Sequence, residues 1–275
     1  MRTLKVLIMC WVLAMIFGCT TEEPINSVGR ISDIGQTATG KDVIDMHGMV
    51  ENRELLDAFG QQTVGKQRLI RYTDEGDPIY HDLTYRDGRV QLQIDTTKDK
   101  FGSGTVQMYD CGKLNREETE TQMRYVLTGC NGEQKEIELL GISFDVNKQD
   151  RFEFVLKYGP GGTNEINTVG QELTKDLQNG QMVTVSDFGI SKKDYQKIYR
   201  QLVLAGYLNE KKLSSTCHGQ DEDPYDLTVY INSAVRHFQW NACDQSLHGK
   251  QMTATVKEII KIVHAGSTYQ SLPKS

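Results

Sequence analysis

Apolar and polar residues alternate along several short segments of the chain, and this period of two predicts half-buried β-strands. The clearest case is IYHDLTYRDGRVQLQID at residues 79–95. Asp87 and Gly88 suit a two-residue type I′ turn, because both central positions of that turn need a positive φ. The turn fixes the strand register and places His81 opposite Ile94. The segment therefore predicts an antiparallel hairpin.

Other segments predict a second hairpin and several helices. YDLTVYINSAVRHFQW at residues 225–240 shows the same alternation. Apolar residues three or four positions apart predict helices over residues 51–65, 164–179, 192–205 and 252–265. Helices beside small antiparallel sheets predict an α+β fold.

A GPGG sequence at residues 159–162 marks the expected domain boundary, because dense Gly and Pro cannot sustain a regular element. We expect a first α+β domain over residues 42–158, a linker over 159–163, a second α+β domain over 164–266 and a tail over 267–275. Each half carries Asp-Pro, then Asp-Leu-Thr, a hairpin and a cysteine, which leaves an internal duplication open.

The first residues have the pattern of an export signal. Arg2 and Lys5 supply positive charge, and residues 4–18 are almost wholly apolar. That run is shorter than the roughly 20 residues of a membrane-spanning helix. Residues 1–18 therefore predict a secretory signal peptide.

Cys19 follows this apolar run in the sequence IFGC, which resembles the lipobox of bacterial lipoproteins. In that family the Cys thiol receives a diacylglyceryl group and becomes the mature N-terminus. Phe17 departs from the pattern, since that position is usually small. Two acyl chains hold a protein on a membrane, at about 0.8 kcal/mol per buried methylene. The alternative is ordinary secretion with Cys19 as an incidental thiol. Residues 19–41 are polar and predict a flexible tether.

The remaining cysteines predict disulfides, because an exported chain meets oxidising conditions. Besides Cys19 and the one inside the signal, there are four, which allow three pairings. We choose Cys111–Cys130 and Cys217–Cys243, since each pair falls within one expected domain. Each closed loop contributes about 3 kcal/mol on the chain-entropy model. A zinc site is the competing interpretation, but the sequence has neither a C-x-x-C pair nor a His at ligand spacing from these cysteines.

Two acidic turns hold the candidate binding residues. Asp77, His81 and Asp82 lie close together, and a carboxylate beside a His can act as an acid–base pair. Side chains alternate along a strand, however, so His81 and Asp82 should point to opposite faces. Asp223 belongs to a second acidic stretch, which resembles a Ca²⁺ loop only weakly because Pro224 interrupts it. We interpret both stretches as solvated turns and keep these four residues as candidate ligand contacts, with no catalytic or metal site assigned.

Several motifs resemble a known family. They are IDMHGMVENRELLDAF, RYTDEGDPIYHDL, DTTKDKFG and the ending Thr128-Gly129-Cys130. The region from Asp42 to Cys130 resembles a family of Gram-positive lipoproteins carrying a domain of unknown function numbered 4362. SDFGISKKDYQKIYRQLVLAGYL and FQWNACDQS are similar to a module found beside such domains. The resemblance implies export, a lipid anchor and a Gram-positive membrane, and it implies no activity.

The formal charge of −6 gives no general attraction to nucleic acid, so we expect no nucleic-acid partner, and we expect no cofactor. We expect a non-catalytic binding or interaction module at the outer face of the cytoplasmic membrane. A lipid on Cys19 would hold it there, and its partner would be an envelope protein or a small ligand. The alternatives are an envelope hydrolase that uses carboxylates such as Asp77 or Asp82, and a small-ligand or metal sensor.

Overall fold

The computed structural model describes residues 40–216 and 223–274, which belong to one compact unit. Antiparallel sheets dominate and are accompanied by helices, which confirms the α+β class. Cys19, the signal peptide and the expected tether up to residue 39 lie outside the described residues, as does Cys217. Within the described ranges, no helix is long and apolar enough to cross a membrane.

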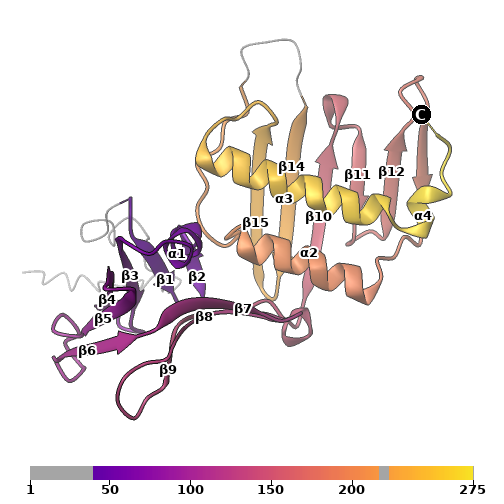
Figure 1. The fold of residues 1–275 in the computed structure, drawn as a ribbon. Coiled ribbons are helices and arrows are strands. Elements are labelled where there is room, and N and C mark those ends of the chain that lie inside the picture. Colours follow the sequence, from indigo (N-terminus) through magenta and orange to yellow (C-terminus); the bar gives the residue numbers. More distant parts are fainter. Residues whose placement is uncertain (1–39, 217–222, 275) are drawn as a thin grey trace, which may run out of the picture. The chain divides into compact units, whose positions relative to one another are not determined.

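The N-terminal half forms a six-stranded sheet in the order β2-β1-β3-β4-β5-β6 (Figure 1). β1 pairs with β3 in parallel, and all other neighbours are antiparallel. One helix, α1, connects β2 to β3. The elements are β1 (Val43–Met46), β2 (Met49–Glu51), α1 (Glu54–Gly60), β3 (Lys66–Tyr72), β4 (Pro78–Arg86), β5 (Arg89–Asp95) and β6 (Val106–Cys111).

The first hairpin is confirmed. Asp87 and Gly88 have φ values of 54° and 77°, as a type I′ turn requires, and His81 lies opposite Ile94. The helix predicted over residues 51–65 is shorter, because Glu51 still pairs with β1.

A three-stranded antiparallel sheet in the order β7-β8-β9 follows. Its strands are β7 (Lys113–Glu118), β8 (Gln122–Thr128) and β9 (Glu136–Ser143). Gln196, on helix α2 (Lys192–Leu204), accepts a hydrogen bond from Val146 N at 3.0 Å and donates one to Phe144 O at 2.7 Å. These bonds fasten α2 to the chain segment just after β9.

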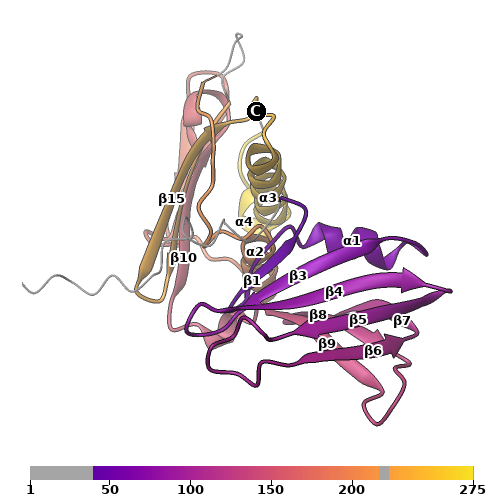
Figure 2. The same ribbon diagram turned by 90° about the vertical axis from the view of Figure 1, so that its left-hand side faces the viewer.

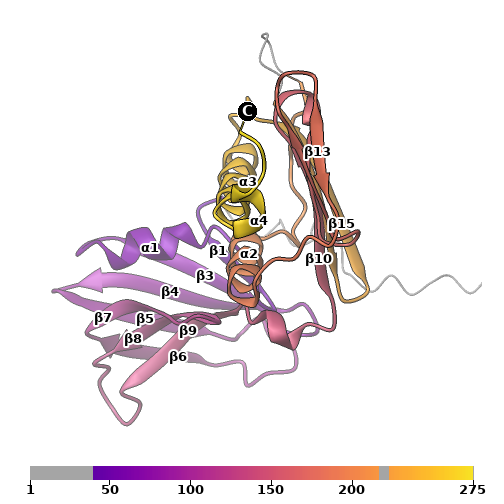
Figure 3. The ribbon, with the colours of Figure 1, turned by 90° about the vertical axis from the view of Figure 1, so that its right-hand side faces the viewer.

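The C-terminal half forms a second six-stranded antiparallel sheet in the order β13-β12-β11-β10-β14-β15. Three helices lie on the same face of this sheet (Figures 2 and 3). The strands are β10 (Phe152–Tyr158), β11 (Asn164–Asn167), β12 (Glu172–Asp176), β13 (Met182–Val185), β14 (Pro224–Ile231) and β15 (Ala234–Asn241), and the other two helices are α3 (Leu247–His264) and α4 (Ser267–Gln270), in the expected tail.

The helix predicted over residues 164–179 is wrong, because this segment forms β11 and β12. Ile166 and Leu173 are both buried and lie opposite each other on the two strands. Their spacing of seven residues fits one helix face, but it also fits two short strands joined by a turn. Gln171 takes a φ of 54° in that turn, which ends any helical run.

The GPGG segment forms a 3₁₀ turn, Pro160–Gly162, between two neighbouring strands of one sheet. β10 therefore belongs to the C-terminal sheet, whereas the expected boundary placed residues 152–158 in the first domain. The expected division into two domains is not confirmed, because the described residues form one compact unit. It stays a prediction.

Candidate ligand-binding site

The carboxylate of Asp77 is paired with Lys100. Its side chain is 8% exposed and accepts hydrogen bonds from Lys100 Nζ at 2.8 Å and from Lys100 N at 3.0 Å. These bonds from Lys100 lower the pKa of Asp77. The carboxylate is thus already occupied by a residue 23 positions away.

The other three candidate residues lie apart. Asp82 accepts two hydrogen bonds from Arg68, at 2.6 and 2.8 Å. His81 points to the opposite face of β4, where it is buried. Asp223 is exposed and directly precedes β14 in the C-terminal half. This arrangement agrees with the prediction that His81 and Asp82 point to opposite faces of the strand.

His81 is held as a neutral side chain. Burial lowers its pKa to about 4, and the charge of Arg71 acts in the same direction. Its Nδ1 atom has no hydrogen-bond partner among the described residues. His81 is therefore a structural residue in the sheet rather than a proton-transfer group near pH 7.

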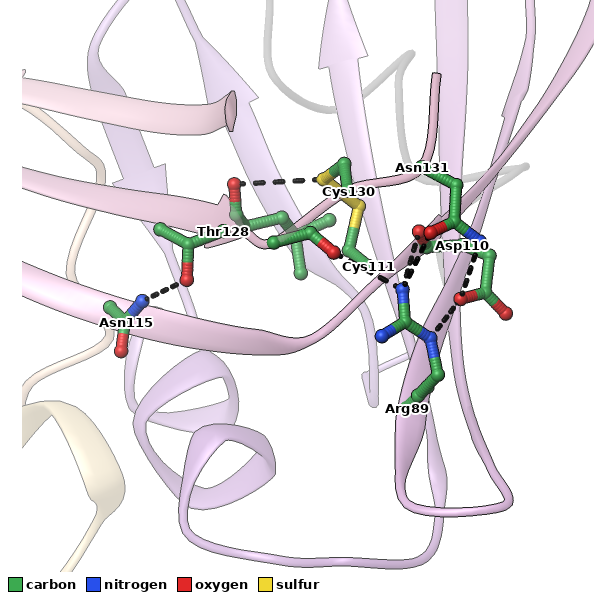
Figure 4. The surroundings of a disulfide bond; sticks show 9 residues. Arg89, Asp110, Cys111, Asn115, Thr128, Cys130 and Asn131 are labelled. Carbon is green, nitrogen blue, oxygen red and sulfur yellow. Dashed lines mark hydrogen bonds and ion pairs between the residues drawn. A yellow bond between two sulfur atoms is a disulfide. The ribbon is translucent and has the colours of Figure 1, made fainter. Parts of the chain in front are cut away.

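The predicted Cys111–Cys130 disulfide is present, with an S–S distance of 2.02 Å (Figure 4). It joins the end of β6 to the residues after β8. Beside it Arg89 donates to the carboxylate of Asp110 (Figure 4). Arg89 also donates to Gly129 O at 3.1 Å. Cys243 is disulfide-bonded, but its predicted partner lies outside the described residues, so that pairing stays a prediction.

A cavity of about 350 Å³ lies where three distant segments meet. These segments are the end of β2 with the start of α1, the end of α2 with the loop after it, and the first turn of α3. Its volume falls within the range of small-ligand pockets, roughly 300–1,000 Å³. The charged and titratable residues that line it are Glu51, Arg53, Glu54, Lys211, His248 and Lys250.

Lys211 is a partly buried amine in this lining. It donates to Ala205 O at 2.7 Å and to Gln251 Oε1 at 3.4 Å. Burial lowers its pKa, whereas the charges of Glu51 and Glu54 act to raise it. An ammonium has three donors, so one remains for a further acceptor.

His248 stands beside Lys211 in the first turn of α3. Its Nδ1 accepts the backbone N–H of Lys212 at 2.9 Å. In the neutral ring this assigns the proton to Nε2. Burial lowers the pKa of His248, and the charge of Lys211 lowers it further. The cavity thus has a neutral imidazole N–H donor near an ammonium group.

Arg53 is fixed on the opposite wall by a buried network. Its Nη1 donates to Asp57 Oδ2 at 2.7 Å and to the Tyr125 hydroxyl at 2.9 Å. That hydroxyl donates in turn to Asp57 Oδ1 at 2.8 Å. Tyr125 is 1% exposed, and burial raises its pKa to about 12. The network anchors α1 on β8 and so fixes the segment that carries Glu51 and Glu54.

Local sequence signals shape the other wall. Ser246 caps α3 by accepting the N–H of Gly249 at 3.0 Å. Gly249 is required there, because a Cβ would lie 2.2 Å from Asp244 Cγ. Gly206 takes a φ of 61° after α2 and turns the chain toward Lys211.

Sequence reasoning missed this site. Glu51, Lys211 and His248 are separated by up to 197 positions in the chain, and each is an ordinary surface residue type. Only the predicted start of the helix at residue 252 carried a signal, since helix N-termini are suited to binding anions.

The comparisons with known proteins inform the N-terminal part of the chain. Residues 40–126 match the family model of a domain of unknown function, DUF4362. The segment thus carries this domain, as the resemblance implied. The curated proteins and the solved structures contain no match to the chain. Glu51, Arg53 and Glu54 lie inside the DUF4362 segment and Lys211 and His248 lie beyond it, so the cavity is formed by both parts of the chain.

Proposed function

We propose that this protein is an exported, lipid-anchored binding module that holds a small ligand at the outer face of the cytoplasmic membrane. The cavity around Lys211 carries the proposal. Its charged side chains come from three distant segments, and Glu51, Glu54, Lys211 and Lys250 form no ion pair with any described residue. Charges held in a cavity without partners favour recognition of a charged ligand.

The anchor is supported by the leader. A short apolar run followed by Gly18 and Cys19 resembles a lipoprotein signal. A lipid on Cys19 would keep the cavity near the membrane and raise its effective concentration toward other membrane-held components.

Binding is favoured over catalysis by the arrangement of the titratable groups. His248 uses Nδ1 to accept a backbone N–H, and Lys211 uses two of its donors on neutral oxygens. A general base must lie within hydrogen-bond reach of the proton that it abstracts, but Nδ1, the accepting nitrogen of the neutral His248 ring, is already occupied by the N–H of Lys212. Fixed donors set apart from the carboxylates are suited to orienting a ligand.

The anchor is tested by metabolic labelling of expressing cells with a radioactive fatty acid. We expect label on the full-length protein and none on the Cys19→Ala variant, which should leave the membrane fraction. Equal labelling or equal membrane retention of both proteins would contradict the anchor.

The binding role is tested separately. The full-length protein in detergent is heated with and without a low-molecular-mass extract of the expressing cells. A bound ligand raises the unfolding midpoint by mass action. We expect a rise that the Lys211→Gln variant loses, and we expect the bound compound to be recovered unchanged. Its chemical conversion would instead support the hydrolase alternative.

A further inference from the structure

The cavity around Lys211 keeps charges of both signs apart. Glu51 and Glu54 lie on the β2–α1 side, and Lys211 and Lys250 lie on the other side. No pair among these four approaches within 4.0 Å in the described part of the chain. Elsewhere the same residue types do pair, for example Lys261 with Glu258 at 3.3 Å. The cavity therefore has a negatively charged side and a positively charged side that do not neutralise each other.

One side of the cavity suits a carboxylate. Lys211 has a free donor, and His248 offers its Nε2–H. These groups stand at the N-terminus of α3, which has 18 residues. The first amides of a helix lack internal acceptors, and the helix dipole favours negative charge there.

The opposite side suits an ammonium group. The charges of Glu51 and Glu54 both act to raise the pKa of Lys211, yet neither carboxylate accepts a hydrogen bond from a described residue. Arg53 between them is engaged by Asp57 and Tyr125, so it does not neutralise them. Two carboxylates with open acceptor positions can receive the N–H groups of an amine.

We infer that the cavity binds a small zwitterion, a free amino acid or a short peptide, with its carboxylate at Lys211 and His248 and its amine at Glu51 and Glu54. This inference rests on the proposed binding function and names its ligand class. The cavity volume of about 350 Å³ admits a ligand of this size.

A simple anion or a simple amine would use only half of these groups. Bringing an anion alone to Lys211 also brings it near two carboxylates, which opposes binding. A ligand with both charges satisfies each side without an uncompensated charge. The distinguishing property of the site is therefore the need for both ends of the ligand.

The test uses three matched probes on the full-length protein in detergent, measured by titration calorimetry. They are glycylglycine, N-acetylglycylglycine, which lacks the amine charge, and glycylglycine amide, which lacks the carboxylate. A charge-assisted hydrogen bond corresponds to about a tenfold change in Kd. We expect each blocked probe to bind at least about tenfold more weakly than glycylglycine.

Substitutions in the cavity test which residue binds each end of the ligand. Lys211→Gln should weaken glycylglycine and leave the affinity for glycylglycine amide nearly unchanged. Glu54→Gln should weaken glycylglycine and leave N-acetylglycylglycine nearly unchanged. Lys212→Gln and Glu210→Gln are the matched controls, since both residues are exposed neighbours outside the lining. Glu54 is itself exposed, so its variant should fold.

The outcomes distinguish failure of the zwitterion inference from failure of the proposed binding function. Equal binding of the acetylated and free dipeptides would overturn the zwitterion inference and leave an anion-binding module. No binding of glycylglycine would also overturn it, while a midpoint rise with the cell extract would still support the proposed function. Identical effects of the site variants and their controls would place the ligand elsewhere.

Discussion

The acidic turn at Asp77 and the cavity at Lys211 contain the same kinds of groups in opposite states. Around the turn, Asp77 is paired with Lys100, Asp82 is paired with Arg68, and His81 is buried. Around the cavity, Glu51, Glu54 and Lys211 remain unpaired within the described residues, and His248 is only partly buried. The acidic cluster that stands out in the sequence thus has its charges paired. The cluster around Lys211, which forms only in the fold, keeps unpaired charges.

The difference follows from how each cluster is assembled. A turn brings neighbouring carboxylates to a surface where flexible Lys and Arg side chains can reach them. The cavity residues come from separate segments: Glu51 ends β2, Glu54 begins α1, Lys211 lies in the loop after α2, and His248 lies in the first turn of α3. Proximity in the sequence therefore does not pair the charges of one side with those of the other. Four substitutions probe this contrast, in order of decreasing effect on stability.

His81→Leu should have the largest effect, seen in the pH dependence of stability. The folded-state pKa of His81 is about 4 and its ordinary value is 6.5. The unfolded chain therefore binds this proton more readily, and stability is lost as pH falls from about 6.5 to about 4. The loss amounts to about 3 kcal/mol. Urea unfolding at several pH values should show a flatter profile for the variant.

A second histidine limits the expected change. His264 also has a pKa lowered to about 4 by burial, so the slope should shrink rather than vanish. A variant with an unchanged slope would mean that His81 accepts a proton in the folded protein without penalty.

Tyr125→Phe should come next, because it removes a buried hydroxyl from both Arg53 and Asp57. Leaving buried polar groups unsatisfied costs about 1–3 kcal/mol. Urea unfolding at pH 7 measures the loss. Tyr109→Phe is the matched control, since the Tyr109 hydroxyl donates to Gln107 at an exposed position. This substitution should cost less than about 0.5 kcal/mol. Equal losses would show that the network does not brace the cavity wall.

These results also mark what the sequence could predict. The Asp-Gly turn specified its hairpin, and the spacing of apolar residues over 192–205 specified α2, because both signals are local. The second predicted hairpin is also present, with Tyr225 opposite Trp240 and their ring centroids 5.1 Å apart. The predicted Cys111–Cys130 pair is confirmed; Cys111 ends β6 and Cys130 follows two residues after β8.

The errors have a physical source in ambiguous or non-local patterns. Ile166 and Leu173 fit a helix and a hairpin equally well until the sheet supplies partners for β11 and β12. The cavity depends on which elements meet, and periodicity carries no such information. The acidic stretch around Asp77 suggested a binding site, but Lys100 already occupies the Asp77 carboxylate.

Arg68→Gln should have a smaller effect, although its bidentate contact with Asp82 has good geometry. The two side chains are 43% and 33% exposed, so solvent screens the pair. An exposed ion pair contributes at most about 1 kcal/mol. The loss should shrink in 1 M salt, where the Debye length is about 3 Å. A loss that salt does not change would indicate that Arg68 acts through packing on Tyr80, whose ring centroid lies 5.0 Å away.

Glu54→Gln should have the smallest effect on stability, within about 0.5 kcal/mol, because the carboxylate has no partner to lose among the described residues. It should still lower the pKa of Lys211, since Glu54 acts to raise it. NMR titration of the ¹³C-methylated lysines measures that change, with Glu210→Gln as the control. An unpaired charge that can be removed without loss of stability is not retained for folding. A pKa of Lys211 that does not move would place Glu54 too far away to share a ligand with it.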